Sequence, residues 1–79
     1  MNIYRHTFVA ECPGNTQPIV YRIEIKKDDK ILVEHIVMAC ALIKRGYHED
    51  IADQLHKQFG GVQVITAHHH GVDIETVRQ

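Results

Sequence analysis

The two cysteines are the side chains of this sequence best suited to covalent chemistry, and they stand in different settings. Cys12 ends a stretch of β-branched and aromatic residues and precedes Pro13-Gly14, a turn signal, so we expect its thiol near the surface at a strand end. An accessible thiolate is a nucleophile, whereas a strand-end thiol that nothing activates is inert. Cys40 falls on the apolar face of an expected helix and is predicted to be a small core residue.

Two expected helices begin with a glutamate next to a histidine, Glu34-His35 and His48-Glu49. A carboxylate in the first turn of a helix needs no function to explain it, because the helix dipole stabilises it by a few tenths to ~1 kcal/mol. A carboxylate also offers two acceptor oxygens to adjacent donors. Glu34 and Glu49 are therefore candidates for binding a planar ligand rich in N–H groups.

The run His68-His69-His70 suggests a metal site, since neutral imidazole is a good zinc ligand. Alternate side chains of a strand point to opposite faces, so His68 and His70 could share a face while His69 points away. A third ligand, such as Cys12 or His6, must then come from elsewhere in the chain. The alternative is that these histidines are solvated or contact a substrate, and we place His70 among the candidate binding residues.

The hydrophobic pattern predicts six elements in the order β-β-α-α-β-β, an α+β fold with an antiparallel sheet and two helices on one face. Gly46 suits a left-handed cap at the end of the first helix. Residues 31–33 either begin that helix or form a short strand. The expected elements are strands 3–11 and 19–25, helices 33–45 and 48–59, and strands 62–66 and 72–77.

Length and composition limit the kind of protein this is. The chain has 79 residues, enough for a single domain over residues 1–79, and a net charge of −1. It lacks a dense Lys/Arg stripe, so we do not expect direct DNA binding. Its longest apolar run, 36–43, is far too short to span a membrane, and we expect a cytoplasmic protein. A domain this small buries only about 60–65% of its unfolded surface, and helix 33–45 is apolar almost all round, so we expect a homo-oligomer.

Four segments of the chain stand out, in order: Cys12-Pro13-Gly14-Asn15-Thr16-Gln17-Pro18, Val33-Glu34, Gly46-Tyr47-His48-Glu49 and Gly71-Val72-Asp73-Ile74. Together they resemble the 7-cyano-7-deazaguanine reductases, the QueF family. The first is similar to that family's Cys-Pro-x-x-x-Gln-Pro turn, the second to a Val-Glu pair at a helix start, the third to Gly-x-Phe-His-Glu and the fourth to a terminal Gly-Ile-x-Ile. Residues 49–55 and 62–70 are more faintly similar to GTP cyclohydrolase I.

The resemblance implies the tunnelling fold, or T-fold, in which such subunits close barrels by oligomerisation. It implies that Cys12 attacks a nitrile to give a thioimide and that Glu49 anchors a purine or pterin ring. It also implies that His48 and Glu34 line the substrate pocket. The expected ligand is a 7-deazaguanine, another purine-like compound or a pterin.

Two departures from the family bear on the activity. The reductases have an acidic aspartate directly after Gln-Pro, where this chain has Ile19, so a proton donor for the thioimide step is missing. Their Glu-x-Lys-Ser-x-Lys-like stretch for NADPH reads Glu34-His35-Ile36-Val37-Met38-Ala39 here, without the lysines, so we expect no NADPH. Related amidine-forming enzymes on deazaguanine-modified tRNA also lack that stretch but keep the acid, which leaves modified tRNA among the candidate partners.

Three functions stay open at this point. The first is a T-fold protein that binds a 7-deazaguanine or pterin, with Cys12 and His48 as catalytic residues and Glu34, Glu49 and His70 as binding residues. The second is a relative without enzymatic activity that serves as a binding or protein-interaction module. The third is a zinc-dependent, cyclohydrolase-like protein that uses Cys12, His68 and His70.

Overall fold

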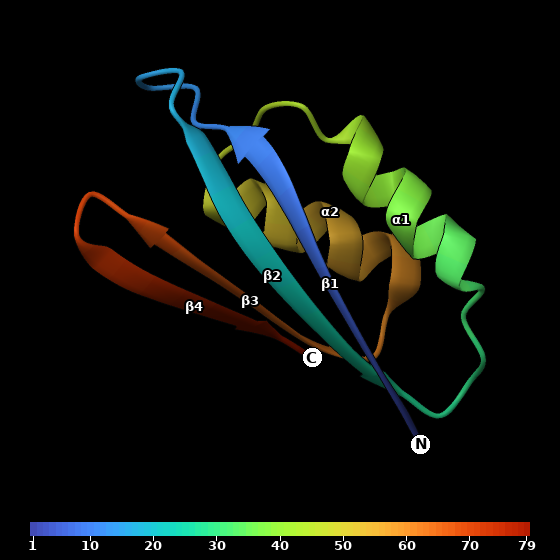
Figure 1. The fold of residues 1–79 in the computed structure, drawn as a ribbon. Coiled ribbons are helices and arrows are strands. Elements are labelled where there is room, and N and C mark those ends of the chain that lie inside the picture. The colour runs from blue at the N-terminus through green and yellow to red at the C-terminus, as the bar shows by residue number, and fades with distance from the viewer.

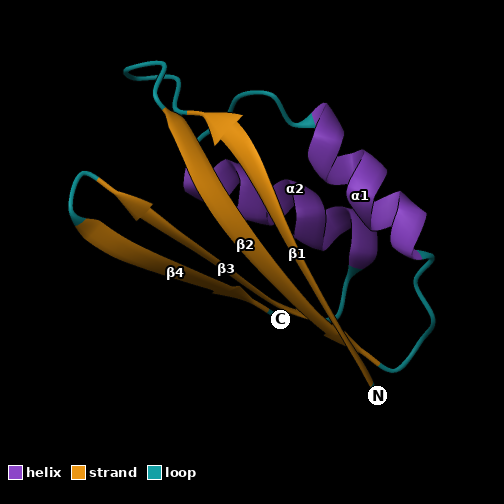
Figure 2. Cartoon of the chain, in the orientation of Figure 1, coloured by secondary structure: helices purple, strands orange, loops and turns teal.

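The computed structural model describes all residues from Met1 to Gln79 and consists of a sheet covered by two helices. Four antiparallel strands follow one another in the order β1-β2-β3-β4, and both helices lie on one face of this sheet (Figures 1 and 2). The predicted α+β class and β-β-α-α-β-β order are confirmed. The elements are β1 (Asn2–Glu11), β2 (Pro18–Lys27), α1 (Val33–Leu42), α2 (His48–Phe59), β3 (Val62–His69) and β4 (Val72–Arg78).

The core lies between the sheet and the helices, and β2 supplies its centre. Every second residue of that strand is buried, as the alternation in its sequence predicts. Leu55 of α2 and Ile65 of β3 pack into the same cluster. The β2 residues that face the helices are Ile19, Tyr21, Ile23 and Ile25, all at most 7% exposed.

The first helix ends earlier than the sequence predicts. It stops at Leu42, with Ile43 already extended, and Lys44 and Gly46 form strand-like hydrogen bonds with Glu11 at 2.9 and 3.1 Å. Gly46 therefore does not form the predicted left-handed cap, and its φ is not positive. The helix begins at Val33, as predicted, and the residues before it, Ile31 and Leu32, are neither helix nor strand.

One side of α1 is apolar but uncovered. Ile36, Ala39 and Cys40 face the core, as their spacing predicts. Another four apolar side chains of the helix are between 50% and 73% exposed, namely Val33, Val37, Met38 and Leu42. Exposed apolar surface of this kind is typical of a site that contacts another molecule. Neither helix has the length and apolar character needed to cross a lipid bilayer.

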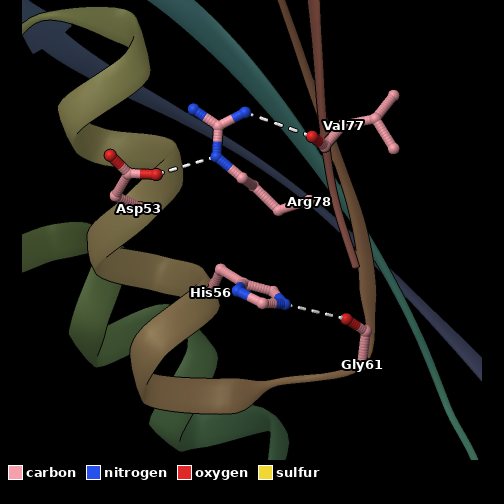
Figure 3. Close-up of polar contacts among 5 residues, drawn as sticks. All are labelled: Asp53, His56, Gly61, Val77 and Arg78. Carbon is pink, nitrogen blue, oxygen red and sulfur yellow. Dashed lines mark hydrogen bonds and ion pairs between the residues drawn. The ribbon is translucent and has the colours of Figure 1, made fainter.

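Polar contacts hold α2 against the end of the sheet (Figure 3). Arg78 of β4 donates from Nε to the Asp53 carboxylate at 2.7 Å and from Nη1 to the carbonyl oxygen of Val77 at 3.1 Å. The His56 ring nitrogen Nε2 lies 3.2 Å from the Gly61 carbonyl oxygen and must carry the proton, since a carbonyl only accepts. Of these contacts, the Arg78–Asp53 pair is the one that joins the sheet to α2, the helix that begins at His48.

Candidate functional site

Three connecting segments meet at one end of the sheet. They are the turn between β1 and β2, the link between α1 and α2, and the turn between β3 and β4 (Figure 1). Arg45 in the link donates to the Pro13 carbonyl oxygen at 3.1 Å, which joins the first two segments. Asn15 and His70 join the first and third, with Nδ2 and Nε2 only 2.7 Å apart. Cys12 lies at this end.

A compact turn fixes the backbone around Cys12. The Cys12 amide donates to the Gln17 carbonyl oxygen at 2.9 Å, and the Cys12 carbonyl accepts from the Thr16 amide at 2.8 Å. Asn15 stabilises the turn because its Oδ1 accepts from the Gln17 amide at 3.1 Å. Thr16 adopts a positive φ of 59°. The thiol follows the buried residues Phe8 and Ala10 in the strand alternation, and therefore turns towards the helices.

A pocket of about 210 Å³ opens beside this thiol. It is mostly apolar, and its titratable residues are one thiol, two phenols and two imidazoles, without a carboxylate. Ile19, the residue at the place of the family's acid, is one of the apolar walls. The lining residues are Cys12, Ile19, Tyr21, Gly46, Tyr47, His48, Ala67, His69 and Ile74. A small apolar pocket with a few polar groups is the usual form of a ligand site.

His48 contributes an imidazole with unused hydrogen-bonding capacity. Both of its ring nitrogens are buried and have no hydrogen-bond partner, which is uncommon for buried polar atoms. The ring lies 5.5 Å from the Tyr21 ring, centroid to centroid. Burial lowers the pKa of His48; the Ile65 backbone beside the ring and the Glu49 carboxylate oppose this shift, and the Arg78 charge adds to it. A neutral imidazole of this kind is suited to accept a proton from a neighbouring thiol.

His48 should make the stability of the protein depend on pH. Its folded-state pKa lies below the ordinary value, so below about pH 6.5 the unfolded chain binds more protons than the folded one, and the free energy of unfolding falls with falling pH. We expect the urea midpoint of the wild type to drop more between pH 7 and pH 5 than that of His48→Gln. The exposed His35 gives the matched control, and His35→Gln should retain the wild-type slope. Equal slopes for His48→Gln and the wild type would contradict this role.

The histidine run is arranged differently from the prediction. His69 continues the buried face of Ile65 and Ala67 and lines the pocket, whereas His68 lies on the opposite face and bonds Asp73 at 2.8 Å. His70 lies in the turn, with φ of 50°, and bonds Asn15. His68 and His70 thus do not share a strand face, and the structure contains no group of three side chains placed to hold a metal ion. The set Cys12, His68 and His70 is not a metal site in this structure.

The other predicted site residues divide into two groups. Cys12 and His48 come together in one pocket, as predicted. Glu49 and Glu34 are exposed and do not line it, and His70 is outside it. Glu34 lies near the opposite end of β1, where the Ile31 amide donates to the Tyr4 hydroxyl, roughly 25 Å from Cys12 along an extended strand.

Cys40 differs from Cys12 as the sequence predicts. It is 1% exposed, and burial raises the pKa of its thiol to about 11. Cys12 is partly exposed, and both cysteines are free. Burial, and then the negative charge of a Cys12 thiolate, raise the pKa of Tyr21, which keeps this pocket phenol protonated.

Comparison with known proteins identifies the fold. No protein-family model and no curated protein matches the sequence significantly. Among solved structures, the apo form of the archaeosine synthase QueF-Like superposes with a TM-score of 0.67 over 98% of this chain and 89% of that chain, at 13% identity. The chain has a QueF-like T-fold. The fold predicted from the four sequence segments is confirmed. At 13% identity, the comparison shows the fold and nothing beyond it. The similarity to GTP cyclohydrolase I stays a prediction.

Proposed function

We propose that this protein binds a 7-deazaguanine, or a related purine- or pterin-like compound, in the pocket beside Cys12, and that the thiol adds to a nitrile on that ligand to form a thioimide. The observation that carries the proposal is the meeting of a partly exposed thiol and an unpartnered imidazole, His48, in one small apolar pocket. A nucleophile beside a base is the arrangement that such an addition requires. The QueF-like fold adds support.

We propose that the reaction stops short of reduction, without NADPH or a metal cofactor. Residues 34–39 carry no lysine that could bind a dinucleotide phosphate. A thioimide can instead react with an amine to give an amidine, and the QueF-like neighbour is described as an archaeosine synthase. Modified tRNA is therefore a candidate partner. Free thiols in both cysteines agree with a reducing compartment such as the cytoplasm.

We further propose that the working form is a homo-oligomer. The exposed apolar residues of α1 would be covered in it, and a second copy would bring its own Glu34 to a pocket that lies far from Glu34 within one chain. Met38→Glu places a charge on this face, and we expect it to reduce the molar mass measured by light scattering to that of a monomer. Lys57→Glu on α2 is the matched control. A monomeric wild type would contradict the proposed assembly.

Ligand binding tests the proposal without relying on the covalent step. Ala67→Leu adds bulk to the pocket wall, whereas Thr66→Leu introduces the same side chain on the opposite face of the sheet. A ligand at 100 times its Kd stabilises by about 2.7 kcal/mol. We expect 7-cyano-7-deazaguanine to raise the melting temperature of the wild type and Thr66→Leu by several degrees, and that of Ala67→Leu hardly at all. No shift in folded wild type would contradict the proposed ligand class.

The exposed side of α1 also favours a second candidate, a non-enzymatic protein-interaction module. In that case the apolar residues of α1 would contact a different protein and Cys12 would be dispensable. The two candidates are distinguished by Cys12→Ala, which should leave the cellular function intact if the protein acts as an interaction module. Loss of function in folded Cys12→Ala would reject the module.

A further inference from the structure

The pocket lacks one group that addition to a nitrile requires. When sulfur attacks the nitrile carbon, negative charge develops on the nitrogen, and a nearby acid lowers the barrier by giving that nitrogen a proton. No carboxylate lines the pocket, and Ile19 fills part of its wall. Burial raises the pKa of the Tyr21 phenol, which makes it a weaker acid than a free tyrosine. Among the lining side chains, imidazole is the group that most readily carries and releases a proton near neutral pH.

Two imidazoles are available, and they differ in their surroundings. His48 is half-buried, but both of its ring nitrogens are enclosed, which favours its neutral form and the role of base. His69 is the last residue of β3 and lies half-buried at the edge of the same pocket, where it can exchange protons with water. The two therefore approach the pocket from different elements, α2 and β3. The enclosed ring of His48 suits a base, and the more accessible ring of His69 suits an acid.

A neighbouring contact holds His69 in place. Because Asn15 uses Oδ1 to accept from the Gln17 amide, its Nδ2 is directed at His70, and Nε2 of His70 must accept. The ring of His70 packs edge-on against that of His69, with centroids 4.2 Å apart. His70 and Gly71 both have positive φ, 50° and 79°, as in the two-residue turns that favour tight hairpins. His70 is thus a positioning residue rather than a ligand contact.

We infer that His69 is the proton donor to the nitrile nitrogen, acting together with His48 in the Cys12 pocket. The inference rests on the proposed nucleophilic role of Cys12. In this step the thiol proton passes to His48, the carbon–sulfur bond forms as one π bond of the nitrile is used, and the nitrogen takes a proton from His69. His48 is left with one extra proton and His69 with one fewer. The proton gained by His48 equals the one lost by His69, so the step is balanced and consumes no oxidant or reductant.

Two electrophiles separate the acid from the base. Addition of Cys12 to 2-cyanopyrimidine, a simple nitrile without the deazaguanine ring, needs a proton on nitrogen. Alkylation by iodoacetamide releases iodide and needs none. We expect His69→Gln to slow the nitrile reaction about 10²-fold and alkylation less than about threefold. His48→Gln should slow both reactions, and His35→Gln, far from the pocket, should change neither.

Rates are read from intact mass, with the modified residue located by peptide mapping. Equal losses in both reactions for His69→Gln would show a structural role and overturn the inference. An unchanged nitrile rate in His69→Gln, or no nitrile reaction at Cys12 in the wild type, would also overturn it. If 2-cyanopyrimidine reacts in a His69-dependent way while 7-cyano-7-deazaguanine gives neither binding nor an adduct, the inference stands and the proposed ligand is wrong.

Discussion

Gly61→Ala is expected to lower the free energy of unfolding by about 3 kcal/mol. Gly61 has a φ of 71°, which L-residues with a side chain rarely adopt. A Cβ at this position would also lie 2.5 Å from the Lys26 carbonyl oxygen, a backbone atom that cannot move without disturbing the pairing of β2 with β3. Both effects act in the same direction. Urea denaturation measures the change.

Gly71→Ala separates the two causes. Gly71 has a similar φ of 79°, but a Cβ there would meet no atom within 4 Å. We expect it to cost about 1 kcal/mol, since only the backbone conformation is unfavourable. Equal losses for the two variants would show that the approach of Gly61 to Lys26 does not contribute.

The second large effect is expected at Gln63, a polar residue that is only 2% exposed. Its Nε2 donates to the carbonyl oxygens of Leu55 and Gly60, at 3.1 and 2.8 Å, and so satisfies acceptors at the end of α2. Gln63→Leu keeps the approximate volume but removes the donors. We expect a loss of about 2 kcal/mol, because buried acceptors without a partner are costly.

Gln63 also carries a destabilising feature, which makes the test decisive. Its Oε1 is buried without a partner. If that unsatisfied oxygen outweighed the two hydrogen bonds, Gln63→Leu would be more stable than the wild type, contrary to our expectation. The exposed Gln58 of α2 gives the matched control, and Gln58→Leu should change the free energy of unfolding by less than ~0.5 kcal/mol.

The sequence predicts the elements well where a single pattern dominates. The alternation of Ile19, Tyr21, Ile23 and Ile25 determines the buried face of β2, and α2 has the predicted bounds, 48–59. It fails at the end of α1, where apolar and helix-favouring residues continue to Arg45. There, pairing of Lys44 and Gly46 with Glu11 competes successfully with the helix, and this tertiary contact leaves no mark on the local sequence.

The sequence predicts only part of the candidate site, because only some of its residues carry a local sequence signal. Cys12 and His48 are marked by a turn and by a helix start, and both line the pocket. His69 was missed because β3 is apolar on both faces, so its parity is ambiguous. Ile65 and Ala67 are buried, and the strand alternation that they define places His69, two residues after Ala67, on the same inward face. Glu49, although next to His48 in sequence, points outside the pocket of its own chain.

The most direct test of the account is the intact mass of the denatured protein after incubation with 7-cyano-7-deazaguanine. We expect one adduct per chain in the wild type, of the mass of the intact ligand because addition releases nothing. The adduct should be absent in Cys12→Ala and retained in Cys40→Ala, whose thiol is buried. An unmodified wild type, shown to be folded, or an adduct that persists in Cys12→Ala, would contradict the proposal that Cys12 is the nucleophile of a nitrile-binding pocket.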